Sequence, residues 1–238
     1  MAVPGFGHVL RIGHRGAAGH APPGNTLASI DAALRIGVDL VEVDIQRTCD
    51  GHLIVLHDRL LQPSTTGHGR VSDQSLDEIR RLRTIPGGQS IPTLPEVLEV
   101  LNGRAGITGP VGLMLEIKES GTAECIHHKV HDSGFQGPVY YASFLHAELR
   151  KIRSIDAAAK TIALLEGAPI DATAFALQAQ ATHAGIGIDS LSQEFVRALQ
   201  DAGVGVFTWT ADEPEEIALA RECGVDGIIS NYPNRLVL

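Results

Sequence analysis

The chain has 238 residues, of which 44% are hydrophobic and 4% aromatic, and its formal net charge is −9. This length suits one large domain or two small ones, and α/β barrels often reach about 250 residues as a single unit. The acidic balance, without a cluster of basic residues, argues against a nucleic-acid partner and against stable anchoring to an anionic membrane. The three cysteines lack metal-ligand spacing, and the N-terminus lacks a signal-peptide pattern, so we expect a cytoplasmic protein.

Short β-rich runs alternate with helical patterns along the whole chain, which is typical of βα units around a parallel sheet. The predicted strands are Val9–Gly13, Leu40–Ile45, Gly112–Ile117, Pro138–Ala142, Lys160–Leu165, Gly185–Ile188, Val204–Trp209 and Gly227–Ser230. Because eight parallel strands can close on themselves, we expect an α/β fold of the (β/α)8 TIM-barrel type, as one domain over residues 1–238.

Helical patterns fill the intervals between these strands, and several end at a glycine that can form a left-handed cap. The predicted helices are Asn25–Ile36, Leu94–Leu101, Ala123–Ser133, His146–Ser154, Ile170–Thr182, Gln193–Ala202 and Pro214–Glu222. Two irregularities interrupt the alternation. A further strand, Leu53–His57, predicts a β-hairpin after the second strand, followed by a polar, glycine-rich insertion at Gln62–Gly88. Too few residues follow the eighth strand for a full helix, so the last helix is expected to be short or missing.

Carboxylates in two of the predicted strands are spaced to share one face. Glu42 and Asp44 are two residues apart, and Glu116 and Lys118 repeat that spacing at the end of Gly112–Ile117. Residues two apart leave the same face of a strand, which we expect to be the barrel interior. Buried carboxylates need a cation, a proton or hydrogen bonds. The pattern therefore predicts a metal site formed by Glu42, Asp44 and Glu116, or an internal ion-pair network with Arg15 and Lys118.

Oxygen ligands alone favour a hard divalent cation, Mg²⁺ or Ca²⁺, over zinc. His14 and Arg15 end the first strand and His57 ends the hairpin strand, so we expect them at the rim where barrel enzymes carry their active sites. Two histidines can exchange protons near neutral pH, while Arg15 and Lys118 supply positive charge. Together these groups favour an anionic ester as substrate, and a phosphodiester matches best.

The order of the motifs resembles that of the glycerophosphodiester phosphodiesterases, of the bacterial cytosolic type, over nearly the whole chain. The shared motifs are His14-Arg15-Gly16, Asn25-Thr26, Glu42-Val43-Asp44, Asp50-Gly51, Val55-Leu56-His57-Asp58, Pro92-Thr93-Leu94, Leu115-Glu116-Ile117-Lys118, Phe207-Thr208-Trp209-Thr210 and Asp226-Gly227-Ile228-Ile229. The resemblance implies a barrel that hydrolyses glycerophosphodiesters to glycerol 3-phosphate and an alcohol with one divalent cation.

The resemblance also implies a role for each candidate residue. Under it, the metal ligands are Glu42, Asp44 and Glu116, the acid–base pair is His14 and His57, and the phosphate-binding residues are Arg15 and Lys118. Trp209 would line the glycerol side of the site, although an inward tryptophan at a strand end can equally pack in the core. Which histidine is the acid, and whether water or the glycerol 2-hydroxyl attacks, both stay open.

The chain departs from the family pattern at three positions. Gly24 stands where the family usually has a glutamate before Asn-Thr, Asp212 where it usually has an asparagine, and Asn231 where it commonly has an acidic residue. Two other functions remain as alternatives to glycerophosphodiester hydrolysis. One is a lysophospholipase D or sphingomyelinase-type phosphodiesterase on the same barrel, and the other is a non-catalytic binder of phosphorylated ligands.

Overall fold

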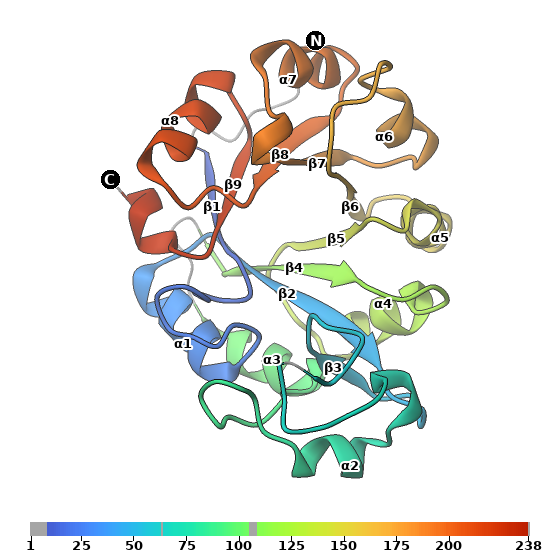
Figure 1. The fold of residues 1–238 in the computed structure, drawn as a ribbon. Coiled ribbons are helices and arrows are strands. Elements are labelled where there is room, and N and C mark those ends of the chain that lie inside the picture. The colour runs from blue at the N-terminus through green and yellow to red at the C-terminus, as the bar shows by residue number, and fades with distance from the viewer. Residues whose placement is uncertain (1–8, 63, 105–108, 238) are drawn as a thin grey trace.

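The computed structural model describes residues 9–62, 64–104 and 109–237. Within these ranges one sheet has the strand order β1-β9-β8-β7-β6-β5-β4-β2-β3, and β1 also pairs with β2. The β1–β2 pair is parallel and connects the first strand of this order to β2, which closes the ring of parallel strands. Strand β3 lies outside the ring and pairs with β2 in the antiparallel direction. The other strands therefore form a closed parallel barrel with helices around it (Figure 1). The predicted TIM-barrel fold is confirmed.

The elements follow the expected order. The strands are β1 Leu10–Gly13, β2 Leu40–Arg47, β3 Leu53–Val55, β4 Gly112–Ile117, β5 Val139–Ser143, β6 Lys160–Leu165, β7 His183–Gly187, β8 Gly205–Trp209 and β9 Gly227–Ser230. The helices are α1 Leu27–Ile36, α2 Leu76–Arg81, α3 Leu94–Leu101, α4 Ala123–Asp132, α5 His146–Ile155, α6 Ala174–Gln178, α7 Gln193–Asp201 and α8 Pro214–Cys223. Short 3₁₀ turns cover Val71–Asp73, Ile188–Ser190 and Pro233–Val237.

Strand β2 shows how the alternation of residue types positions a polar site inside the barrel. Val41, Val43 and Ile45 are fully buried in the apolar cluster that packs against the surrounding helices. Leu40, on the opposite face, packs into the interior cluster of the barrel. Because successive side chains alternate between faces, Glu42 and Asp44 point the same way as Leu40. The interior is thus apolar where the strand begins and carboxylate-lined toward its end.

The region after β6 differs from the prediction of a long helix at Ile170–Thr182. Helix α6 covers only Ala174–Gln178, and β7 begins at His183, two residues before the predicted strand. The Asp171 carboxylate accepts hydrogen bonds from the backbone N–H groups of Thr173 and Ala174, so a turn precedes the helix. The long helix was a wrong prediction because Thr182 and His183 extend the sheet instead.

The insertion after β3 is better ordered than its composition indicated. Its helix α2 begins with a capping box, in which Ser75 accepts from the Glu78 backbone and Glu78 accepts from the Ser75 backbone. Ile54, Leu61, Val71 and Ile79 belong to a separate buried cluster beneath it. The hairpin strand also ends earlier than predicted, at Val55, so His57 lies in the following loop.

The end of the chain matches the expected lack of a full closing helix. Only a 3₁₀ turn at Pro233–Val237 follows β9 in the described part of the chain. Among the described residues, none of the helices combines the length and the apolar character that crossing a membrane requires.

Candidate active site

The structure brings Glu42, Asp44 and Glu116 together at the carboxyl ends of β2 and β4. Asp44 lies directly opposite Glu116 in the parallel register of these strands. One carboxylate oxygen from each of the three residues lies within 4.8 Å of the others. Glu42 and Asp44 are 2% and 0% exposed. Their Oε1 and Oδ1 atoms are buried and have no hydrogen-bond partner among the described residues. Such a donor set fits a hard divalent cation, which would satisfy these oxygens.

Burial and mutual repulsion make the three carboxylates unequal. Burial, together with the charge of Asp44, raises the pKa of Glu116 to about 7. The same two causes raise the pKa of Glu42 well above its usual range. Burial also opposes ionisation of Asp44, but Arg15, Lys118 and His57 outweigh it and hold the pKa of Asp44 below its usual range. Asp44 is therefore the anionic centre of the cluster, and its two neighbours retain protons readily unless another cation is near.

Arg15 and Lys118 provide fixed positive charge around Asp44. The Arg15 Nε atom lies 3.1 Å from Asp44 Oδ2. The Lys118 Nζ atom lies 2.7 Å from Glu116 Oε1 and 3.4 Å from Asp44 Oδ1. Arg15 has a left-handed backbone with φ 51°, and its backbone N–H donates to Glu42 Oε2 at 2.8 Å. The sequence left open whether the carboxylates form a metal site or an ion-pair network with Arg15 and Lys118. The structure contains the ion pairs, and the same carboxylates also offer oxygen ligands to a metal.

Asn25 is a site residue whose role the sequence did not indicate. Its side chain is 4% exposed, donates from Nδ2 to Asp44 Oδ2 at 2.7 Å, and accepts from the Asp44 backbone N–H at 3.2 Å. Its φ of 59° is left-handed, a conformation that asparagine tolerates better than most residues. The Asn25-Thr26 motif was the available signal, because Thr26 caps α1 and fixes Asn25 just before that helix.

His14 enters the site from the end of β1. Its Nε2 atom lies 4.0 Å from Glu42 Oε2, and its Nδ1 atom lies 2.7 Å from Asn231 Oδ1. Burial, reinforced by the charge of Arg15, lowers the pKa of His14 to about 4. The ring is consequently neutral at physiological pH.

His57 reaches the same site from the loop after β3. Its charge contributes to the low pKa of Asp44, which places the two groups within electrostatic reach. Its Nδ1 atom lies 2.9 Å from Asp58 Oδ1. Strand β3 ends before His57, so Asp58 lies in the same loop and orients the histidine ring beside it.

Trp209 ends β8 at the same rim. Its indole N–H donates to the Gly185 carbonyl at 3.0 Å, and its ring meets the Phe144 ring edge-on at a centroid distance of 5.4 Å. The Phe144 side chain is itself 44% exposed. Trp209 is half-buried, so it is packed against the barrel and also open to the rim.

The three departures from the family pattern all lie at this end of the barrel. A Cβ atom on Gly24 would lie 2.8 Å from the Cβ atoms of both Arg15 and Ala18, so the local packing leaves no room for a side chain. Asp212 and Asn231 contact each other, with Asn231 Nδ2 donating to Asp212 Oδ2 at 2.7 Å. Asn231 in turn contacts His14.

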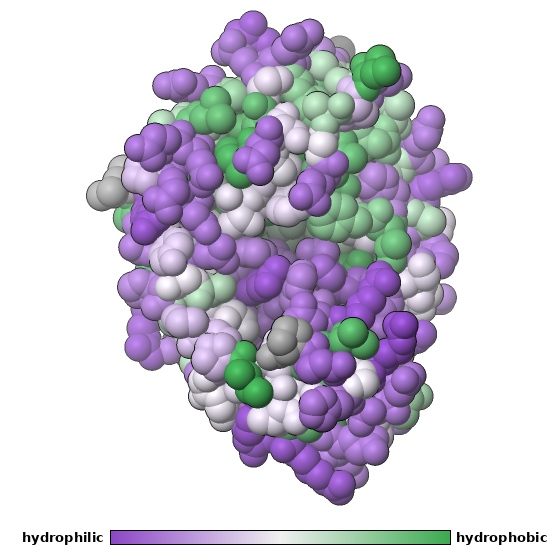
Figure 2. Space-filling model, viewed as in Figure 1, coloured by the Kyte–Doolittle hydropathy of each residue, from purple (hydrophilic) through white to green (hydrophobic). Residues whose placement is uncertain are grey.

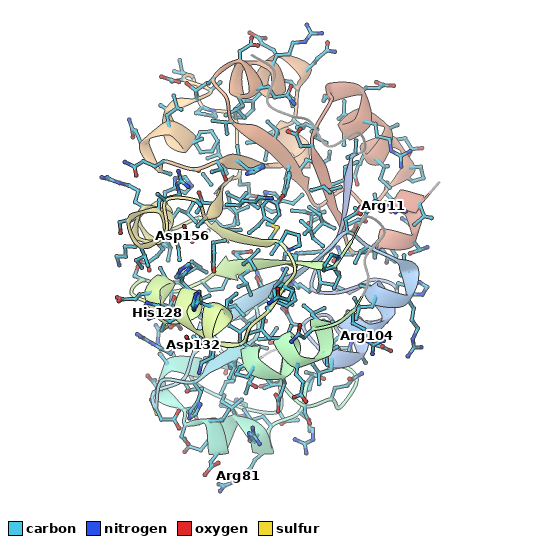
Figure 3. The ribbon with its side chains drawn as sticks, turned by 180° about the vertical axis from the view of Figure 1, so that it is seen from behind. Arg11, Arg81, Arg104, His128, Asp132 and Asp156 are labelled. Atoms are coloured by element: carbon cyan, nitrogen blue, oxygen red, sulfur yellow. The ribbon has the colours of Figure 1, made fainter. Side chains whose placement is uncertain are left out.

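Further histidines lie on helix α4. His128 is exposed and projects with Asp132 from the outer side of α4 (Figure 3). His127 on the same helix bonds to the Tyr141 hydroxyl at 3.1 Å. His128 thus faces solvent, whereas the half-buried His127 packs against Tyr141 of β5.

The rim has a polar side and a more apolar side. Figure 2 shows a hollow at its centre, with hydrophilic residues gathered toward β2 and β4 and more hydrophobic ones toward β5 and β6. The polar side matches the positions of Asp44, Glu116 and Lys118 at the ends of β2 and β4. The arrangement can hold a cation, bind an anion and exchange protons, which are the functions that hydrolysis of a phosphate ester requires.

Comparison with known proteins identifies a family with this architecture. The sequence pattern of the "Glycerophosphoryl diester phosphodiesterase family" matches residues 14–235. A glycerophosphodiester phosphodiesterase of Caldanaerobacter subterraneus subsp. tengcongensis is 31% identical, over 96% of this chain and 96% of its own. One of Bacillus subtilis is 29% identical, over 95% of this chain and 84% of its own.

Solved structures agree with this family. An Oleispira antarctica phosphodiesterase, solved in complex with the product sn-glycerol-3-phosphate, superposes with a TM-score of 0.85 at 25% identity, over 95% of this chain and 94% of its own. A putative glycerophosphoryl diester phosphodiesterase from Silicibacter pomeroyi has a TM-score of 0.84 at 26% identity, over 97% of this chain and 92% of its own. The chain therefore belongs to the glycerophosphoryl diester phosphodiesterase family and is a phosphoric diester hydrolase.

Proposed function

We propose that this chain, as one barrel domain, hydrolyses glycerophosphodiesters to glycerol 3-phosphate and an alcohol, with a divalent cation and two histidines. The observation that carries the proposal is the meeting of Glu42, Asp44 and Glu116 with Arg15 and Lys118 at one barrel end. The Oleispira relative bound to sn-glycerol-3-phosphate supports the same product class.

Glu42, Asp44 and Glu116 are the residues that would hold the cation, Mg²⁺ or Ca²⁺. The buried Oε1 of Glu42, which has no hydrogen-bond partner among the described residues, supports this assignment, as do the raised pKa values of Glu116 and Glu42. When bound, the ion supplies charge that polarises the phosphoryl group. Arg15 and Lys118 lie beside the same carboxylates and would bind the non-bridging phosphate oxygens.

His14 and His57 would move the protons. His14, neutral because of burial, is suited to take a proton at Nε2 from the attacking group, which is either water or the glycerol 2-hydroxyl followed by water. His57, hydrogen-bonded to Asp58, would return a proton to the leaving alkoxide. Trp209, with its N–H committed to Gly185, would present its ring to the glycerol carbons.

Release of glycerol 3-phosphate from glycerophosphocholine tests these roles. His14→Ala and His57→Ala should each lower turnover by about 10²–10⁴-fold, because a positioned acid or base contributes that much. His131→Ala is the matched control, since His131 is exposed on α4, and it should retain wild-type turnover. Unchanged turnover in either site variant would remove that residue from the mechanism.

A lipid phosphodiesterase is the second candidate. It is favoured by Phe144, an apolar side chain that is 44% exposed and packs edge-on against Trp209 at the rim. Comparing kcat/KM for glycerophosphocholine with that for lysophosphatidylcholine and sphingomyelin decides between them. Higher kcat/KM on a lipid would replace the glycerophosphodiester as the preferred substrate.

A further inference from the structure

Three side chains form a line across the ends of three adjacent strands, β8, β9 and β1. Asp212 follows β8, Asn231 follows β9, and His14 follows β1. Asn231 Nδ2 lies 2.7 Å from Asp212 Oδ2, and Asn231 Oδ1 lies 2.7 Å from His14 Nδ1. The line therefore connects a carboxylate to the ring of a proposed catalytic residue through one amide.

The hydrogen bonds around Asp212 determine which way that amide points. Its Oδ1 atom accepts from the Ser230 hydroxyl at 2.9 Å and from the Asn231 backbone N–H at 2.8 Å. The Ser230 oxygen accepts from the Tyr232 backbone N–H, so its own hydrogen is free to point at Asp212. A carboxylate only accepts hydrogen bonds, so its Oδ2 atom must face the NH₂ group of Asn231. The carbonyl oxygen of the amide is then left for His14.

The amide in turn determines which ring nitrogen of His14 carries the hydrogen. Because Asn231 presents an acceptor, His14 must donate from Nδ1, and Nε2 keeps its lone pair on the side of Glu42. We propose that Asp212 and Asn231 are positioning residues that hold His14 as the Nδ1–H tautomer, with Nε2 free to accept a proton. The consequence for catalysis rests on the proposed function of His14, whereas the tautomer itself does not.

Replacing Asp212 by asparagine should reverse the direction of two hydrogen bonds, the one between residues 212 and 231 and the one between Asn231 and His14. The introduced amide would keep its carbonyl oxygen toward the two donors, Ser230 and the Asn231 backbone, and would place its NH₂ group toward the Asn231 side chain. The Asn231 amide would then turn its oxygen to that NH₂ group and its own NH₂ group to His14. A donor facing Nδ1 requires the Nε2–H tautomer, which cannot accept a proton at Nε2.

Exchanging the two residues should restore the original direction of the hydrogen bond to His14, in which the ring donates from Nδ1. In Asp212→Asn/Asn231→Asp, the asparagine donates to the carboxylate, and the carboxylate accepts from His14 Nδ1–H. Both orders of amide and carboxylate thus present an acceptor to the ring.

Nuclear magnetic resonance of ¹⁵N-histidine-labelled protein at pH 7 tests the proposal directly. The His14 signals are assigned by their loss in His14→Gln, and their ¹⁵N shifts identify which ring nitrogen is protonated. We expect Nδ1–H in the wild type, Nε2–H in Asp212→Asn, and Nδ1–H again in the exchanged double variant. A wild type with Nε2–H overturns the proposal, and this outcome requires only that the His14→Gln variant used for the assignment is folded.

Turnover and stability complete the test. Asp212→Asn should lower kcat by about 10–100-fold, the usual effect of losing an orienting partner, with KM little changed. The double variant should regain most of the wild-type kcat. Asp189→Asn removes the same charge from an exposed position after β7 and should retain wild-type kcat. An Asp212→Asn variant that folds and keeps Nδ1–H overturns the proposal, as does a folded double variant that fails to regain Nδ1–H. If the tautomers change as expected but the wild type hydrolyses no phosphodiester, the proposed function fails and the positioning role stands.

Discussion

Asn25 should be the most sensitive supporting residue of the carboxylate cluster. It is buried, its side chain exchanges two hydrogen bonds with Asp44, and its backbone is left-handed. In Asn25→Ala, losing a hydrogen bond to a charged group destabilises the fold by about 1.5–3 kcal/mol. Holding alanine in a left-handed conformation adds roughly 1–2 kcal/mol. We therefore expect a total loss of about 2.5–5 kcal/mol in the free energy of unfolding.

Asn25→Gly separates the two contributions. Glycine adopts the left-handed backbone freely. It also increases the conformational entropy of the unfolded chain, which lowers the free energy of unfolding by about 0.4–1 kcal/mol. It should therefore be about 0.5–1 kcal/mol more stable than Asn25→Ala. Urea unfolding at pH 7 measures both variants, and calorimetric titration with Ca²⁺ should show affinity lowered by about 10–100-fold in each. An Asn25→Ala variant within 0.5 kcal/mol of the wild type, roughly the scatter of surface substitutions, would refute the reasoning.

Two further predictions concern stability. His183 is packed between the rings of Tyr140 and Phe207, and burial lowers its pKa from 6.5 to about 4. The unfolded chain therefore binds a proton that the folded one does not, so this residue reduces stability as pH falls below about 6.5, by about 3 kcal/mol near pH 4. Urea unfolding at pH 7 and 4.5 measures this decrease in the free energy of unfolding, which should be smaller in His183→Phe than in the wild type by the contribution of His183. The same pH dependence in both proteins would contradict the prediction. Gly24→Ala should lower the free energy of unfolding by about 1–3 kcal/mol, because its Cβ would collide with Arg15 and Ala18. A variant with unchanged Tm would show that the loop yields instead.

The sequence predicted best what depends on short-range periodicity. The spacing of Glu42 and Asp44 predicted a shared face, and the parallel register then places Glu116 opposite Asp44. The strand pattern predicted the closed barrel for the same reason, because alternation along a strand is a local property. The roles of these residues in catalysis stay predictions.

Contacts between distant segments were beyond this kind of reasoning. The bond from Asn25 to Asp44 joins residues far apart in sequence, and so does that from Asn231 to His14. No periodicity encodes such pairs. Helix α2 was missed for another reason, because the composition of the insertion was weighed as a whole while the Ser75–Glu78 capping box within it was readable.

We expect Glu42, Asp44 and Glu116 to support hydrolysis by holding a divalent cation. The most direct measurement is the rate of glycerol 3-phosphate release from glycerophosphocholine by chelator-treated protein, before and after addition of Mg²⁺ or Ca²⁺. We expect no turnover before addition and recovery afterwards, with no recovery in Asp44→Asn. Equal turnover with and without the cation, or none on any glycerophosphodiester in either state, would contradict it.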